Sequence, residues 1–223
     1  MTARALETTH DQRRDQMLVA AAELIAQRGF SETRIADVAE RVGASPALVI
    51  YYFGTKDSLL TGALRYSEDT FYSAADEMLG SAASLRERLE ILVSLTCIPQ
   101  REDEVPGSWG LWFDLWTQAF RHPEVARDRI ELDQRWRDTI ARVVKDGIEA
   151  GEIEPFDAEG FAVTFSALLD GLTIQVALRD PVVDPERAFT IAMTFAAREL
   201  GLEWQPSNDR KKIQNRSKNG QDR

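Results

Sequence analysis

The chain has 223 residues, of which 43% are hydrophobic and 29% are charged, and its formal net charge is −10. This composition excludes a disordered, collagen-like or low-complexity protein. The single cysteine, Cys97, excludes an intramolecular disulfide and a cysteine-based zinc site. We see no apolar stretch of ~18 residues and no apolar segment of a secretory signal, so we expect a cytoplasmic protein without a membrane partner.

The charge is unevenly distributed along the chain. Residues 1–66 are neutral overall, residues 67–202 carry a net charge of −13, and residues 203–223 carry +3. The first third can therefore approach a phosphate backbone without repulsion. The acidic middle favours solubility, and it would also concentrate a cationic small molecule, because a cleft of one sign attracts the opposite sign.

Two helices are predicted at the start of the chain. Apolar residues recur at helical spacing over residues 11–28, and Gly29 ends this segment. Thr33 can cap a second, short helix, which Gly43 closes.

A third short helix follows after a turn over residues 43–45. Ser45 followed by Pro46 is typical of a helix start, and this helix is expected to run to about Tyr52. A turn of three or four residues with glycine between two short helices is the helix-turn-helix pattern. In that motif the second helix enters the DNA major groove.

If this pattern binds DNA, the start of the third helix faces base edges and the residues after it reach phosphate oxygens. The expected base-facing residues are Ser45, Pro46, Ala47, Leu48 and Ile50. The expected phosphate contacts are Tyr51, Tyr52 and Lys56. Leu48 and Ile50 cannot hydrogen-bond a base, although they can contact a thymine methyl group. A plain three-helix packing unit would show the same spacing, so the pattern alone leaves both interpretations open.

Helical periodicity continues through the rest of the chain, without a convincing strand pattern. The further expected helices cover residues 55–79, 84–98, 109–120, 123–151, 157–178 and 184–201. Residues 102–106 are expected to form a loop. We therefore predict an all-α protein of about nine helices. It comprises an N-terminal three-helix unit at 1–54, a larger helical domain at 55–202 and a polar, basic, disordered tail at 203–223.

An aromatic cluster is the most unusual feature of the larger domain. Its members lie near one helical face: Trp109, Trp112, Phe113, Trp116 and Phe120, with Trp136 on the next helix. They are either core residues or the wall of a ligand pocket. Tryptophan faces attract ammonium groups by ~0.5–2 kcal/mol each. Asp114, Asp170 or a glutamate of the fourth helix could then supply a counter-charge, with Thr173 nearby, while a neutral apolar or aromatic ligand would need none.

The last two helices have broad apolar faces that need a partner. That partner is either the same chain or a second copy. The residues expected at a dimer interface are Phe165, Leu168, Leu172, Phe189, Met193 and Ala196.

Enzyme motifs are weak in this sequence. A di-iron bundle needs two Glu-x-x-His pairs, and the chain offers one, Glu7–His10. Glycine-rich phosphate loops and the common serine nucleophile motifs are absent. We expect no catalytic residue, no cofactor and no metal ion. The alternative is a helical small-molecule-binding protein or enzyme that does not act on DNA.

The stretch from Arg14 to Leu64 resembles the N-terminal domain of TetR-family transcriptional repressors. The resemblance lies in ETRIADVAERVGAS around the turn and in YYFGTKDSLL at the start of the fourth helix. It implies a homodimer that binds a pseudo-palindromic operator. It also implies a small-molecule inducer in the C-terminal domain that releases the DNA.

The same resemblance implies roles for individual residues. Thr33 matches the family's phosphate-contacting cap of the second helix, and Arg34 beside it could contact phosphate or a minor groove. Ser45, Tyr52 and Lys56 match further family DNA contacts. From Trp109 to Gly201, the chain is similar to the C-terminal domain of the choline-repressor branch of the family, in particular in the segments WGLWFDLW and LLDGLTIQ.

Overall fold

The computed structural model describes residues 3–99, 107–121 and 123–206, which form helices only. The helices are α1 (Ala3–Arg28), α2 (Ile35–Arg41), α3 (Pro46–Phe53), α4 (Lys56–Ser81), α5 (Leu85–Cys97), α6 (Gly107–Ala119), α7 (Pro123–Glu149), α8 (Ala158–Ala177) and α9 (Pro185–Leu200). The predicted all-α fold of about nine helices is therefore confirmed for these residues. The loop predicted at 102–106 and residues 207–223 of the predicted tail lie outside them.

Local side-chain chemistry begins five of the described helices where the sequence predicts. Caps that accept a hydrogen bond from the backbone amide three residues on are Ser45, Thr55, Ser84, Asp157 and Asp184. The predicted Thr33 cap is wrong. Helix α2 is capped at Arg34 instead, whose backbone amide donates to Asp37 Oδ2 at 2.9 Å. Helix α1 begins at Ala3, earlier than the predicted residue 11.

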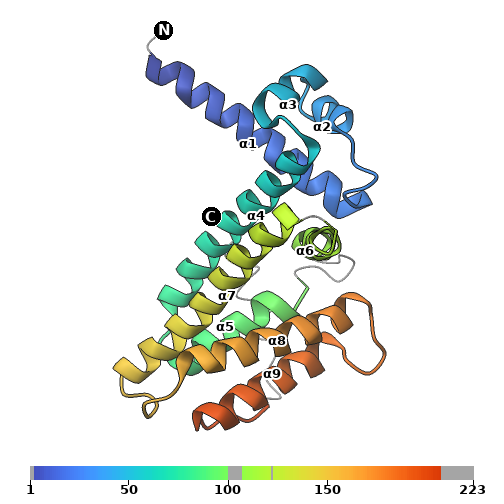
Figure 1. The fold of residues 1–223 in the computed structure, drawn as a ribbon. Coiled ribbons are helices and arrows are strands. Elements are labelled where there is room, and N and C mark those ends of the chain that lie inside the picture. The colour runs from blue at the N-terminus through green and yellow to red at the C-terminus, as the bar shows by residue number, and fades with distance from the viewer. Residues whose placement is uncertain (1–2, 100–106, 122, 207–223) are drawn as a thin grey trace, which may run out of the picture.

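One core joins the N-terminal helices to parts of the larger domain. We call α1, α2 and α3 the head; it packs at one end of the molecule (Figure 1). Its core includes fully buried Met17, Leu18 and Val49, and it continues into the first half of α4, into α6 through Leu111 and Leu115, and into the start of α7. Helix α4 thus passes from the head into the larger domain without interruption.

A second core lies toward the other end of the molecule. It is built by α5, the second half of α7, α8 and α9. Three phenylalanine rings stack within it, with ring centroids of Phe161 and Phe165 5.0 Å apart and those of Phe165 and Phe195 6.1 Å apart. Burial of such large side chains supplies much of the stability of the fold.

Helices α4 and α7 lie side by side and run in the same direction (Figure 1). Their outer faces are joined by three ion pairs, each between residues 66 positions apart. These pairs are Arg65–Glu131 at 2.7 Å, Asp69–Arg135 at 2.5 Å and Asp76–Arg142 at 2.7 Å. The constant separation shows that the two helices keep one register along this face.

Helix α8 is long and apolar enough to cross a membrane by length and composition alone, with a mean hydropathy of 1.4 over 18 residues. This corrects the expectation that no such stretch exists. The helix packs against α7, α5 and α9, and Phe161, Phe165 and Leu169 on it are buried. Its apolar character is therefore explained by its place in the second core.

Candidate nucleic-acid interface and ligand cavity

The turn between α2 and α3 has helix-turn-helix geometry. Gly43 has φ of +60°, in the left-handed region that favours glycine, and Ser45 Oγ accepts from the Leu48 amide at 3.2 Å. Arg13 on α1 donates to the Gly43 carbonyl at 3.2 Å. Helix α1 therefore contacts the turn that precedes α3.

Helix α3 has one buried face and one exposed face. Val49 is fully buried in the head core, whereas Ile50 is 49% exposed and Tyr51 is 75% exposed. The predicted base-facing residues Ser45, Pro46 and Ala47 are also exposed, while Leu48 and Tyr52 are half-buried. The Tyr51 and Tyr52 rings meet edge to face, with centroids 5.6 Å apart. An apolar and aromatic surface of this kind suits contacts to thymine methyl groups and phosphates.

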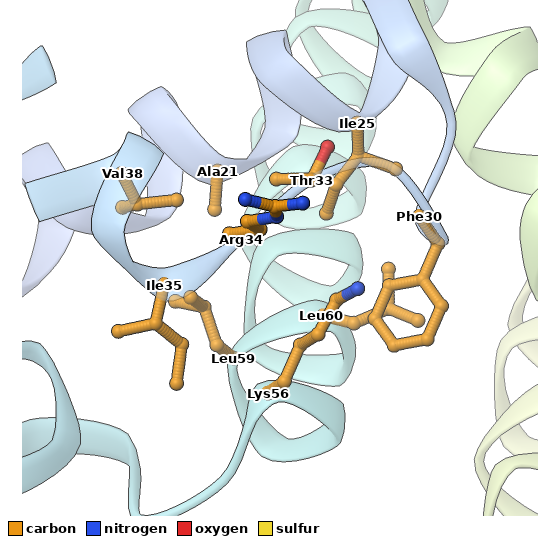
Figure 2. A pocket seen from close by; sticks show the side chains of 10 residues that line it. All are labelled: Ala21, Ile25, Phe30, Thr33, Arg34, Ile35, Val38, Lys56, Leu59 and Leu60. Carbon is orange, nitrogen blue, oxygen red and sulfur yellow. The ribbon is translucent and has the colours of Figure 1, made fainter.

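The side chains of Thr33, Arg34 and Lys56 gather where α2 and α4 begin (Figure 2). Thr33 is only 3% exposed and its hydroxyl donates to the Gly29 carbonyl at 2.9 Å, so this hydroxyl faces inward. Lys56 Nζ donates to the Ser31 carbonyl at 3.2 Å and lies 4.4 Å from the centroid of the Phe30 ring. The hollow between them holds about 10 Å³, room for at most one water molecule, so it is no inducer site.

A larger cavity of about 120 Å³ lies between the two cores. Its walls come from α4, α5, α6, α7 and α8. The lining residues are Leu64, Ser67, Glu68, Phe71, Tyr72, Leu95, Thr96, Trp109, Leu111, Trp112, Trp116, Asp133, Trp136, Arg137, Ser166 and Asp170. Four of the five tryptophans of the chain therefore surround one space.

Most of the residues predicted for a ligand pocket lie in this cavity wall. Trp109, Trp112, Trp116 and Asp170 line it, whereas Phe113 and Thr173 do not.

The two residues outside the wall have other contacts. The Phe113 ring packs against Trp116, with centroids 5.8 Å apart. Thr173 is buried, and its hydroxyl donates to the Thr96 carbonyl at 3.1 Å. These two residues therefore support the wall rather than form it.

Three carboxyl groups and one guanidinium line the cavity. Burial raises the pKa of Glu68 to about 7 and that of Asp170 to about 6, and neighbouring Asp133 contributes to both increases. Asp133 itself pairs with Arg129 at 3.1 Å. Arg137 bonds to Gln134, with its two closest nitrogens 2.9 and 3.3 Å from Oε1. The carboxyl groups outnumber the cation, which makes the cavity acidic.

The adjacent carboxylates Glu68 and Asp69 read as a solvated pair in the sequence, and this prediction is wrong for Glu68, which is 5% exposed. The sequence did predict a glutamate of the fourth helix as one source of counter-charge. The sequence nevertheless contains a pattern that predicts a buried Glu68. Leu60, Leu64, Glu68 and Tyr72 follow one another at intervals of four, which places the glutamate on the buried face of α4. A charged residue on such a face needs a partner.

Helix α6 has a second face that contacts the head. Asp114, which we considered as a counter-charge, does not line the cavity; its Oδ2 accepts from the Phe30 amide at 2.9 Å. A Cβ atom at Gly110 would lie 3.2 Å from the backbone of Ala26 on α1, so a larger residue would require the two helices to move apart by a few tenths of an ångström. The helix that carries Trp112 and Trp116 is therefore in direct contact with the end of α1.

The residues expected at a dimer interface are mostly internal. Phe165, Leu172, Phe189, Met193 and Ala196 are at most 5% exposed within one protomer, and only Leu168 is half-buried. That part of the prediction is wrong, because the apolar faces pack against each other in the same chain. The exposed apolar surface of these helices lies elsewhere: Val163, Ala167, Gly171, Leu178 and Ile191.

Comparison with known families agrees with this architecture. Residues 17–63 match the model of bacterial regulatory proteins of the tetR family. Residues 85–201, more than half of the chain, match the C-terminal domain of BetI-type transcriptional repressors. The protein therefore belongs to the TetR family of bacterial transcription regulators, which are not enzymes. Within that family it carries a BetI-type C-terminal domain.

The relatives reported next each cover more than four fifths of the chain. The HTH-type transcriptional regulator BetI of Rhizobium meliloti is 26% identical over 189 residues, which is 84% of this chain and 89% of the relative. A transcriptional regulator from Saccharomonospora viridis, solved in complex with choline, is 30% identical with a TM-score of 0.73, over 83% of this chain and 95% of that one. A TetR-family regulator from Rhodococcus sp. is 28% identical with a TM-score of 0.72, over 85% and 99%.

Proposed function

We propose that the protein is a dimeric, cytoplasmic transcriptional repressor that a choline-like cation releases from a pseudo-palindromic operator. The observation that carries the ligand class is the acidic cavity between the two cores, lined by four tryptophans. Tryptophan faces and carboxylates both favour a positive charge. The solved choline complex of the Saccharomonospora viridis relative supports the same class.

On the DNA side, α3 enters the major groove and its exposed residues contact bases and phosphates. Ile50 and Tyr51 are the most exposed large side chains of this helix. Arg34, at the start of α2, and Lys56, at the start of α4, hold the DNA backbone on either side, helped by the exposed amides of two helix N-termini. The Thr33 hydroxyl donates to the Gly29 carbonyl and does not face the DNA. Thr33 therefore contributes to DNA binding only by holding the chain that leads into α2.

A second copy of the chain covers the exposed apolar face of α8 and α9. Along α8 the large exposed side chain of Val163 is followed by Ala167 and Gly171, and a Cβ at Gly171 would meet nothing within 4 Å. Small residues allow two helices to approach closely, and an exposed apolar patch marks an interaction surface. Dimerisation through this face places two α3 helices on successive major grooves.

Helix α6 transmits the presence of the ligand to the head. A cation between the tryptophan rings displaces Trp112 and Trp116, and the opposite side of the same helix holds the Phe30 amide through Asp114. A shift of α6 therefore moves the end of α1, and Arg13 near the middle of the same helix contacts the turn before α3. The ligand favours the head separation that does not fit the operator, which is a population shift between two states.

A footprint of the purified protein on DNA upstream of its own gene, over a salt series, tests this function. We expect a protected, dyad-symmetric site whose affinity falls steeply with salt, and loss of protection on adding choline. Selection of bound fragments from the whole genome covers operators located elsewhere. The proposal is wrong if neither experiment yields a symmetric site, or if choline leaves the protection unchanged.

A further inference from the structure

One carboxyl group in the cavity is without a hydrogen bond. Glu68 is 5% exposed, and neither of its two oxygens has a hydrogen-bond partner among the described residues. Burying an unpaired carboxylate is costly, and nearly all buried polar groups in proteins are hydrogen-bonded. This side chain therefore needs an explanation that the fold alone does not provide.

The cations around Glu68 are engaged elsewhere. The Arg65 guanidinium bonds to Glu131, and the Arg135 guanidinium bonds to Asp69 and stacks 4.1 Å from the centroid of the Tyr72 ring. Arg65 thus pairs on the outer face of α4 and α7, whereas Arg135 acts on Glu68 through its charge without a hydrogen bond. The inner face keeps a carboxyl group that no residue of the described chain neutralises by a direct contact.

The chemistry of a quaternary ammonium matches this arrangement. Such a cation has no N–H group, so it interacts through charge and through aromatic faces. A carboxyl group that accepts no hydrogen bond, beside aromatic rings that line the same cavity, offers both interactions.

We infer that the Glu68 carboxylate is the counter-ion of the ligand and that it selects a permanent cation over a neutral molecule of the same shape. This inference rests on the proposed choline-like ligand and names the residue that recognises its charge. The tryptophans alone would bind both molecules, because both bury the same apolar surface. The carboxylate distinguishes them.

Protonation of Glu68 is then coupled to ligand binding. The charged and titratable groups that bear on this carboxyl are Arg65, Asp69 and Tyr72 on α4 and Asp133 and Arg135 on α7, with Arg137 on α7 and Asp170 on α8 in the same cavity wall. Burial raises the pKa of Glu68 to about 7 in the empty cavity. A bound cation lowers this pKa, and the carboxyl group releases its proton to solvent. The Kd of a permanent cation should therefore rise about tenfold between pH 8 and pH 6.

Ligand titrations followed by tryptophan fluorescence test this assignment. The probes are choline and its uncharged carbon analogue, in which a carbon atom replaces the nitrogen. The proteins are the full chain, the variant Glu68→Gln and the matched control Glu77→Gln, an exposed glutamate on the same helix. Calorimetry in two buffers of different ionisation enthalpy measures the proton released, and ¹³C NMR of the empty protein measures the Glu68 pKa.

The expected results are specific to Glu68. The full chain and Glu77→Gln should bind choline at least tenfold more tightly than the analogue at pH 8, with proton release near pH 6.5. Glu68→Gln should lose this preference and the proton release, and still bind the analogue.

Two outcomes would overturn the inference, and they can be told apart. If Glu68→Gln binds choline with the affinity and pH dependence of the full chain, the counter-ion is another residue, while the choline-like ligand stands. If the full chain itself binds choline no better than the analogue at any pH, the proposed ligand class is wrong and the assignment of Glu68 fails with it.

Discussion

Replacing Glu68 by glutamine should stabilise the empty protein in a pH-dependent way. The carboxyl group has a pKa of about 7, against 4.5 ordinarily, because it is buried. Below about pH 4.5 it is protonated in both the folded and the unfolded chain and has no effect. As the pH rises toward 7 the unfolded chain ionises first, so the free energy of unfolding falls. At ~1.4 kcal/mol per pKa unit, the loss is roughly 3 kcal/mol once the pH exceeds 8.

Urea denaturation without ligand, followed by far-UV circular dichroism at fixed protein concentration, measures this effect. We expect Glu68→Gln to match the wild type near pH 4.5 and to exceed it by roughly 2–3 kcal/mol at pH 8. Glu77→Gln, exposed on the same helix, should follow the wild type throughout. If the difference between Glu68→Gln and the wild type is the same at both pH values, the reasoning from burial is refuted.

Three further substitutions test the remaining parts of the proposal. Tyr51→Ala removes an exposed side chain of α3 and should weaken operator binding roughly tenfold in a gel-shift assay, with unchanged choline affinity; unchanged operator affinity would remove Tyr51 from the interface. Asp114→Ala leaves the Phe30 amide without its acceptor and should cost about 1–3 kcal/mol of stability, while choline releases less DNA at equal occupancy; normal release would exclude this route. Ala167→Glu places a charge on the exposed face of α8 and should yield monomers in analytical ultracentrifugation; a dimer of wild-type affinity would locate the interface elsewhere.

The helix boundaries were largely predictable because caps depend on chemistry within four residues. Ser45, Thr55 and Ser84 accept from the amides that their positions predict. Thr33 was the exception among the predicted caps, because Arg34 and not Thr33 stands at the N-cap position of α2. The Asp37 carboxylate takes the Arg34 amide, and the Thr33 hydroxyl bonds to a carbonyl on the preceding turn.

The partners of the apolar faces were not predictable from periodicity. The pattern shows that Phe165 and Phe189 need a partner, but it does not say whether this partner is the same chain or a second copy. The structure resolves the question because α8 and α9 bury these side chains within one protomer. Likewise, Trp112 and Trp116 would have the same helical spacing in a packed core as in the wall of a ligand cavity. Only the positions of α4, α7 and α8 leave a space beside them.

The three ion pairs between α4 and α7 have a consequence for measurements on this protein. A slide of one helix along the other by a single turn, about 5.4 Å, would misalign all three pairs at once. The two helices should therefore move as one rigid body, although each exposed pair contributes at most about 1 kcal/mol. Dissolved salt weakens the ion pairs between α4 and α7 and, at the same time, the contacts between the protein and DNA. The apparent strength of an inducer will consequently depend on ionic strength, even for an uncharged ligand.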